Sequence, residues 1–374
     1  MFPYLFHKYH NSLSNPNEPI YYKELKKENE INKKLIQSIH CFNLEHFEEL
    51  FTIFIELGKD HFSTIVTFCN GEIGHLINKY PTITWLQIKN KGFDLGNKFI
   101  TVQYLKDKSI DYNYIFYLHS KSDLNRRKLY YRSFVQNYDL MIHYLKENPN
   151  LGGIFPDLLI RAPYLNDSLP PYVCKEPNYT VNNHYMSELN EYLGFSVNYF
   201  FTEGNFFVIH KDIASKIYSD LKIYNLLNEE YSCDINWVKN YYKYNSVVDP
   251  AIIYEQYQKK NHCGSSLELH LRENRKWGDA MIEHSLERIV LGAVINMNKD
   301  FKILPIRPLK EEYITKLVDI IKHKKYDDPS LLMDPYFYVK HNKLSDTFKN
   351  VRQISHHYIK QGQYRGLLFN HYLL

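Results

Sequence analysis

The sequence predicts an α/β protein with a Rossmann-like, mostly parallel central sheet, helices on both of its faces, and a small helical C-terminal appendage. Two patterns lead to this fold class. Between residues 35 and 300, short runs of β-branched and aromatic residues alternate with longer segments whose apolar residues recur at helical spacing. The strand-like runs are short and apolar throughout, which is typical of parallel strands buried on both faces. The 374 residues, 44% of them hydrophobic, are enough for a sizeable core.

The expected strands and helices alternate along the chain. Asn43 is a suitable N-cap for the first helix, in which Phe47, Leu50 and Phe54 recur at helical spacing. Pro149 ends the third helix. The strands are expected at residues 35–42, 63–71, 84–92, 114–121, 151–159 and 200–210, the last interrupted at residues 203–205. The helices are expected at residues 43–57, 93–107, 124–148, 210–221 and 278–297.

Three further segments complete the predicted organisation. Residues 1–34 form a polar N-terminal lead-in, whose charged run at 23–34 is interpreted as a solvated helix. Residues 160–200 contain four prolines and are expected to form a long irregular loop, which in a compact domain is usually functional or mobile. A large α/β domain at 35–300 is then followed by residues 301–374, a linker (ILPIRPLK) and a mainly helical appendage.

Composition narrows the function classes. The formal charge of +4, from 46 basic and 42 acidic residues, is weaker and more dispersed than a dedicated nucleic-acid-binding domain shows, so no nucleic-acid partner is expected. Five scattered cysteines without a CxxC pair argue against a disulfide framework or a structural zinc site. Neither a signal peptide nor a transmembrane segment is expected. We therefore expect a cytoplasmic protein, in the host cytoplasm if the chain is viral.

Polar clusters follow four of the expected strands. They occupy residues 40–43, 70–71, 90–94 and 119–123. Because ligands of parallel α/β sheets bind beyond the carboxyl ends of the strands, these clusters predict a nucleotide pocket at one rim. The alternative is that turns at strand ends use Asn, Gly and Asp for conformational reasons alone.

Six segments, in this order, resemble the rhamnan synthesis protein F family over residues 36–297: SIHCFNLEHFEEL, NKGFDLGNKF, FYLHSKSD, NLGGIFP, EGNFFVIHKD and GDAMIEHSLER. The resemblance implies a glycosyltransferase of bacterial cell-wall and O-antigen polysaccharides, with the A-type glycosyltransferase fold. The tail at 334–366 resembles a short repeat often appended to bacterial glycosyltransferases. The residues that carry this second resemblance are His357, Tyr358, Gly362 and Arg365.

The family implies a nucleotide-diphosphate sugar as donor, a glycan or glycoconjugate as acceptor, and hexosyl transfer. Its name alone points to rhamnose or another deoxyhexose. Asp94 is expected to accept hydrogen bonds from the ribose hydroxyls or the base, although the Asn90–Gly92–Asp94 run also fits a plain turn with a helix cap. The residues expected to hold the nucleotide and its diphosphate are His40, Asn43, Asn70, Asn90, Gly92, Asp94, His119, Ser120, Lys121, His284 and Arg288.

Related enzymes commonly carry an Asp-x-Asp metal site after a central strand, where this chain has His119-Ser120-Lys121. A fixed cation can neutralise the charge that grows on a diphosphate leaving group. We therefore expect a metal-independent transferase that requires no cofactor, with Mg²⁺ or Mn²⁺ recruited by Asp123 as the alternative. The simplest other explanation is that His119 and Lys121 only cap the sheet edge and pair with carboxylates.

Inverting transfer needs one general base. Asp279, at the start of the predicted helix 278–297, is the first candidate and Glu203 the second; an N-cap is the alternative role of Asp279. Gly204 would allow close approach to the sugar, and Glu287 would orient Arg288 or His284, unless these residues form only an intrahelical network. Two other functions stay open at this point: a non-catalytic carbohydrate-binding or assembly subunit, and a polysaccharide phosphotransferase.

Overall fold

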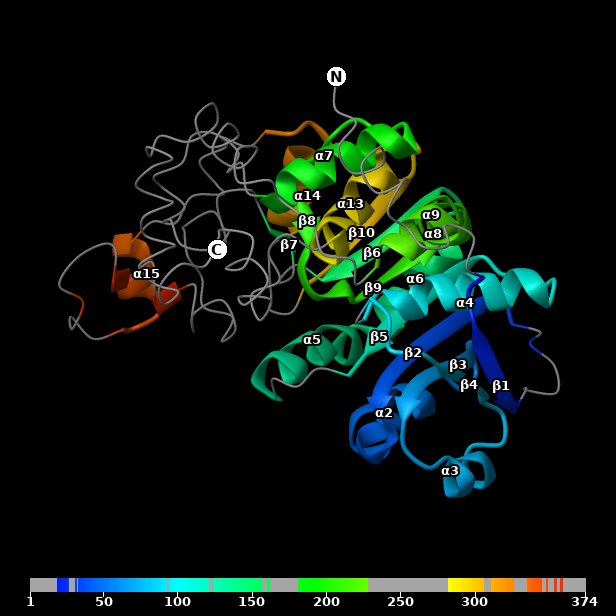
Figure 1. Ribbon diagram of the computed structural model, residues 1–374. Coiled ribbons are helices and arrows are strands. Elements are labelled where there is room, and N and C mark those ends of the chain that lie inside the picture. Colours follow the sequence, from blue (N-terminus) through cyan, green and yellow to red (C-terminus); the bar gives the residue numbers. More distant parts are fainter. Residues whose placement is uncertain are drawn as a thin grey trace, which may run out of the picture.

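The centre of the protein is an eight-stranded mixed sheet with the order β1-β4-β3-β2-β5-β9-β6-β10 (Figure 1). Its strands are β1 Tyr22–Lys26, β2 Leu35–Asn43, β3 Phe62–Asn70, β4 Thr84–Ile88, β5 Tyr114–His119, β6 Leu151–Pro156, β9 Phe207–His210 and β10 Asp300–Leu304. A separate pair joins β7 Ile160–Arg161 to β8 Phe201–Thr202. The computed structural model describes residues 19–26, 31, 33–92, 94–120, 124–156, 160–161, 181–227, 282–305, 311–325, 335–344, 348, 353–354 and 357–358.

Most neighbouring strands of the large sheet are parallel. β4, β3, β2 and β5 form a continuous parallel block, and β6 and β10 form a parallel pair. β9 runs antiparallel between β5 and β6, and β1 runs antiparallel along β4 at the edge. The predicted α/β class with a mostly parallel sheet is therefore confirmed.

Helices cover both faces of the sheet and create two hydrophobic cores. Strand β5 supplies both, since Ile115 and Tyr117 belong to one core while Phe116 and Leu118 belong to the other. The first core includes side chains from α4 Gly96–Asp107, α7 Val181–Leu193, α8 Lys211–Tyr218, α9 Leu221–Leu226, α13 Ile282–Asn296 and α14 Glu311–Lys322. The second includes side chains from α2 Phe47–Gly58, α3 Gly74–Lys79, α5 Leu124–Gln136 and α6 Tyr138–Glu147.

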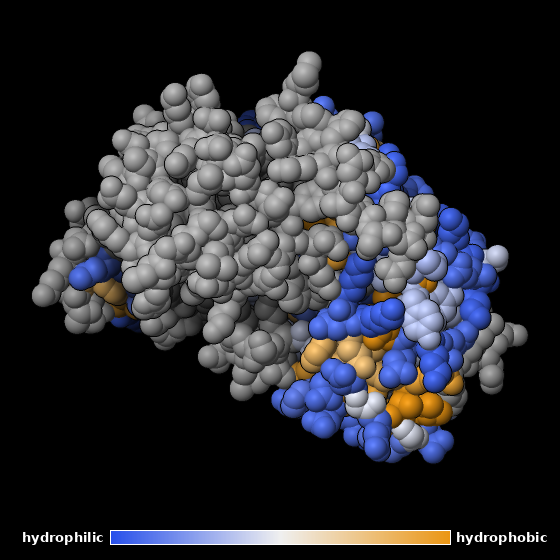
Figure 2. All heavy atoms as spheres, viewed as in Figure 1, coloured by the Kyte–Doolittle hydropathy of each residue, from blue (hydrophilic) through white to orange (hydrophobic). Residues whose placement is uncertain are grey.

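The surface matches this two-sided burial. On the face shown in Figure 2 the described surface is largely hydrophilic, and its apolar side chains form separate patches. Within the described part of the chain, no helix is long and apolar enough to cross a membrane.

The charged lead-in does not form the expected helix where it is described. Tyr22–Lys26 is an edge strand that pairs with β4. Its Tyr22 hydroxyl donates to Asp107, and its Glu24 accepts from the Tyr104 hydroxyl, so α4 holds the strand in place. Lysines on an edge strand also discourage pairing with other chains.

The single long helix expected at 124–148 is two helices, α5 and α6. The break is at Asn137, which has φ −114° and ψ 25°. Its side-chain amide donates 2.7 Å bonds to the carbonyls of Ser133 and Pro305, and this local bonding competes with the helical ladder.

Two segments expected to be irregular are ordered. Val181–Leu193, inside the predicted loop, is helix α7, while the four prolines of that loop lie outside the described residues. The predicted linker begins inside β10, which buries Phe301 and Ile303 beside β6. Beyond it, the tail contains α14 and α15 Pro335–His341.

Two of the four residues that carry the second resemblance, His357 and Tyr358, contact α15. The Tyr338 hydroxyl and the Nδ1 of His357 lie 2.9 Å apart, and the Tyr338 ring meets that of Tyr358 edge-on. Gly362 and Arg365 lie outside the described residues.

Candidate functional site

The strand order reverses between β2 and β5. The chain runs outward from β2 to β3 and β4, then returns to place β5 on the other side of β2. In an open α/β sheet, the crevice beyond such a switch point is where ligands bind. His40 and His119 are direct register partners there, and both are buried. Ser120 joins the two ends, because its N–H donates to the His40 carbonyl at 2.8 Å.

The two histidines carry different charges. Nδ1 of His40 lies 3.0 Å from the Thr67 hydroxyl, which itself donates to the Ile39 carbonyl, so Nδ1 is the donor. Burial, followed by the charge on His119, lowers the pKa of His40 to about 4. His40 is therefore neutral at pH 7 and offers no charge to a phosphate.

Both ring nitrogens of His119 face oxygen acceptors. Nδ1 lies 3.0 Å from the Ser120 carbonyl, and Nε2 lies 2.6 Å from the Gly204 carbonyl. Because a carbonyl oxygen can only accept, both nitrogens must carry protons, and the ring is an imidazolium. Oδ2 of Asp94, 3.0 Å from Nε2, supplies the counter-charge. The ring also stacks on Phe206 at a centroid distance of 4.2 Å.

The partner of His119 is a strained turn, Glu203–Asn205, between β8 and β9. Gly204 has φ 87° and Asn205 has φ 59°, so two consecutive residues are left-handed. A Cβ on Gly204 would lie 3.0 Å from the ring of Tyr130, which makes glycine the best fit. Backbone strain of this kind persists only where the surroundings hold it, and it clusters at functional sites.

Four ionisable side chains hold this turn, and we call Asp94, Lys98, His119 and Glu287 the charged cradle. His119 donates to the Gly204 carbonyl, and the Glu287 carboxylate accepts from the Gly204 N–H. Lys98 Nζ lies 3.3 Å from the Asn205 carbonyl, and Asp94 accepts from the Asn205 side-chain amide at 3.0 Å. The cradle brings together β5, α4, the loop before α4, and α13 around one turn.

The loop before α4 places Asp94. Gly92 has φ 71°, and its carbonyl accepts from the N–H of Leu95 at 2.8 Å and from that of Gly96 at 3.3 Å. A Cβ on Gly96 would lie 1.8 Å from the Lys91 carbonyl, so any side chain there would displace the loop. The Asn-x-Gly-x-Asp run is thus a tight turn as well as the source of a cradle residue.

The remaining predicted residues are dispersed along the rim or outside the described chain. Asn43 caps the short helix Leu44–His46, with its side-chain oxygen accepting from the Glu45 N–H at 3.2 Å. Asn70 pairs with it in register and is exposed, as is Asn90. Arg288 is buried with its guanidinium 4.8 Å from the centre of the Phe201 ring. Lys121, Asp123 and Asp279 lie outside the described residues, as do the side chains of Glu203 and His284.

Sequence reasoning missed Lys98 and Asn205. Lys98 lies in the run GNKFITVQYL, all of which is buried apart from Gln103. A single charged residue in an otherwise uncharged helical run was the available signal, since lysine is almost never fully buried without a partner. Asn205 gave a weaker signal, as asparagine tolerates left-handed backbone after a glycine.

No protein-family model matches the chain, and no curated protein matches it. Across the described ranges, no three His, Cys, Asp or Glu side chains come together in a way that could hold a metal ion. Asp94 offers a poor start to such a site, because its Oδ2 already accepts from His119 and Asn205. The described residues therefore do not fit a divalent cation.

Proposed function

We propose that this chain is a glycosyltransferase with the A-type fold, related to the rhamnan synthesis protein F family. It would move a hexosyl group from a nucleotide diphosphate to a hydroxyl of a glycan. The observation that carries the proposal is the charged cradle at the switch point, where a strained turn is held by four ionisable side chains. A left-handed turn of this kind lowers stability, and such strain is found mostly where the geometry of a functional site requires it.

The reaction needs little beyond positioning and one proton transfer. The acceptor oxygen forms a bond to the anomeric carbon, the bond from that carbon to the diphosphate breaks, and the diphosphate leaves with the electron pair. The hydroxyl proton passes to a carboxylate, for which Glu203 and Asp279 remain the candidates. Glu203 begins the turn that the charged cradle holds, so the cradle also restrains the backbone of Glu203.

The geometry changes the role proposed for His119. Its two nitrogens are already engaged by carbonyl oxygens and by Asp94, and its side chain is 3% exposed. We therefore propose that His119 positions the turn through its bond to the Gly204 carbonyl. Ser120 and Lys121, which follow His119 in the sequence, are the candidates for contact with the diphosphate. The ends of β2, β3 and β4, with Asn43, Asn70 and Asn90, are the proposed nucleoside side of the rim.

The test is an incubation of the purified protein with UDP-, dTDP- and GDP-sugars, followed by measurement of released nucleoside diphosphate. We expect slow donor hydrolysis with one nucleotide class, and a higher melting temperature with the free diphosphate of that class. Absence of both effects across the three classes would overturn the proposal and favour a binding or assembly subunit.

A further inference from the structure

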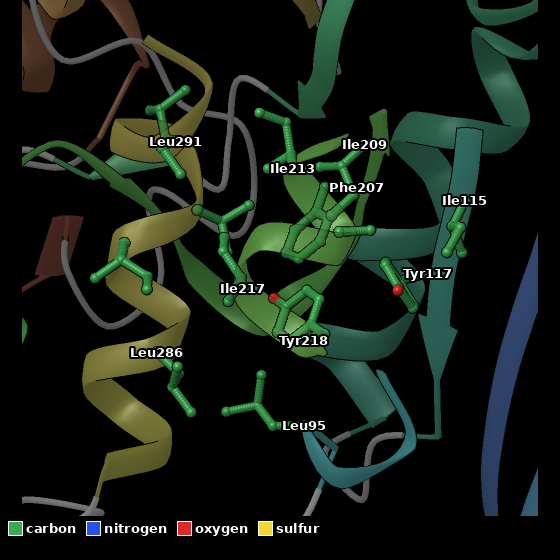
Figure 3. Close-up of a cluster of buried hydrophobic side chains, with 14 of the residues drawn as sticks. Leu95, Ile115, Tyr117, Phe207, Ile209, Ile213, Ile217, Tyr218, Leu286 and Leu291 are labelled. Carbon is green, nitrogen blue, oxygen red and sulfur yellow. The ribbon is translucent and has the colours of Figure 1, made fainter. Parts of the chain in front are cut away.

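Lys98 is a charged side chain inside the first hydrophobic core. It is 1% exposed, and its ammonium lies 4.4 Å from the centre of the Tyr117 ring and 5.1 Å from that of Phe207. Figure 3 shows Tyr117 of β5, Phe207 of β9 and Tyr218 of α8 gathered in one apolar cluster. Removing an ammonium from water costs stability unless partners compensate for it.

The compensation comes from the turn and from two carboxylates. Lys98 Nζ donates to the carbonyl of Asn205, the non-glycine residue held at φ 59°. Burial lowers the pKa of Lys98 to about 8, while the charges of Asp94 and Glu287 act in the opposite direction. The amine is thus costly to bury and bonded to the most strained non-glycine residue of the turn.

Other titratable groups surround the same space. The imidazolium of His119 on β5 is tied to Asp94, and the charge on Lys98 contributes to the low pKa of His40 on β2. From β5 and α8, burial raises the pKa values of the Tyr117 and Tyr218 hydroxyls well above their usual range, so both stay neutral. Lys98 is the member of this group that changes charge just above neutral pH.

We infer that Lys98 is a positioning residue of the transfer reaction, which holds the Asn205 carbonyl and so keeps the Glu203–Asn205 turn in its left-handed geometry. This inference rests on the proposed function and adds a residue to it.

The inference predicts a loss of activity that the loss of stability does not explain. Lys98→Met keeps an unbranched side chain of similar length, but its melting temperature should fall because the Asn205 carbonyl and the nearby carboxylates lose a buried partner. Its kcat should fall at least about tenfold, with a change in donor KM below about threefold, because the turn acts in the transition state. A residue with only a structural role would lower the melting temperature and leave the kcat of the folded protein unchanged.

Two further variants sharpen the test. Lys108→Met is the matched control, because Lys108 also lies over a tyrosine ring, at 5.7 Å from Tyr104, and pairs with Glu24 at the far end of α4. It should leave kcat unchanged. Lys98→Arg keeps a permanent charge, so the alkaline decline of kcat expected near pH 8 in the wild type should be absent in this variant if it folds.

A readout that does not depend on activity separates this inference from the proposed function. Amide hydrogen exchange in a peptide spanning residues 201–207 should be faster in Lys98→Met than in the wild type or Lys108→Met at one pH. Equal exchange, or a wild-type kcat in Lys98→Met, would overturn the inference. A wild-type protein that releases no nucleoside diphosphate would overturn the proposed function and with it the catalytic role, even if exchange in the turn is faster.

Discussion

Nε2 of His119 lies 3.0 Å from Oδ2 of Asp94, and the same two side chains hold the backbone and the side chain of the turn at Glu203–Asn205. The two residues are 25 positions apart in sequence, and the turn lies more than 80 positions beyond them. One ion pair therefore joins the end of β5, the loop before α4 and the connection between β8 and β9.

Removal of the Asp94 charge should destabilise the protein and stop transfer. Asp94→Asn keeps the size of the side chain but leaves the imidazolium of His119 without its counter-charge. Since Asp94 is 25% exposed, we expect a loss of roughly 2 kcal/mol in the free energy of unfolding, below the usual cost of breaking a fully buried pair. Urea denaturation at pH 7 measures this loss.

The control for Asp94→Asn is a more exposed ion pair between a carboxylate and a basic side chain. Glu48 and Lys79 form such a pair between α2 and α3, and their side chains are 39% and 58% exposed. Glu48→Gln should leave the urea midpoint and the activity unchanged, because exposed pairs are screened by water and salt. Equal effects of the two substitutions would show that the His119–Asp94 pair contributes no more than a surface contact.

His40 should make the protein sensitive to mild acid. Its pKa of about 4 in the folded protein lies below the usual histidine pKa of 6.5. Above pH 6.5 His40 is neutral in both the folded and the unfolded protein, so it does not affect stability. Between pH 6.5 and pH 4, His40 is protonated in the unfolded chain but stays neutral in the folded protein, so stability falls as pH falls. The total loss is roughly 3 kcal/mol.

The measurement is the free energy of unfolding in urea at several pH values from 7 down to 4.5. Gln at position 40 cannot titrate. The slope of unfolding free energy against pH should therefore be smaller in His40→Gln than in the wild type, by an amount equivalent to at most one bound proton. If the variant and the wild type show parallel curves, burial of neutral His40 is not the cause of the acid sensitivity.

The sequence predicted the central strands of the sheet better than the helices and the edge strand around them. Apolar runs such as residues 114–118 can only be buried, and their alternation with amphipathic segments determined the class. The break at Asn137 was not predictable, because it depends on a bond to the Pro305 carbonyl, 168 residues away. The strand at Tyr22–Lys26 was missed for a similar reason, since its charged residues are stabilised by contacts with α4 that no local pattern encodes.

The residues of the candidate site also differ in how far the sequence could predict them. His119 and Asp94 were predicted because each follows a strand at the expected rim, whereas Lys98 belongs to a helix and reaches the site only through tertiary packing. The predicted contact of His119 with phosphate arose from its position alone. A one-dimensional pattern places a residue at an edge, but it does not show which acceptors will surround the ring.

Transfer should not depend on a divalent cation if Lys121, which follows β5 in the sequence, neutralises the leaving diphosphate. With the preferred donor identified, activity in excess EDTA should stay within about twofold of that in Mg²⁺ or Mn²⁺, because a fixed cation serves the same electrostatic role. Complete loss in EDTA, reversed by Mn²⁺, would contradict the metal-independent mechanism and make Asp123 the first residue to substitute.

Two glycines provide a test of whether the turn itself matters. Gly204 and Gly194 both have positive φ, 87° and 76°, so alanine at either position costs about 1 kcal/mol or more of backbone strain. A Cβ on Gly194 meets nothing within 4 Å, whereas one on Gly204 lies 3.0 Å from the ring of Tyr130. We expect both alanine variants to unfold at lower urea concentrations, and only Gly204→Ala to lose donor hydrolysis as well.

The comparison separates strain from position, because the two substitutions impose similar strain at different places. Gly194 ends α7, away from the cradle, so Gly194→Ala should retain wild-type kcat once the folded fraction is taken into account. Gly204→Ala must move either the turn or Tyr130, and any movement shifts the carbonyl that His119 holds. If both variants keep the same kcat, the left-handed turn is a structural feature of the β8–β9 connection, and the residues that perform the transfer must be sought elsewhere on the rim.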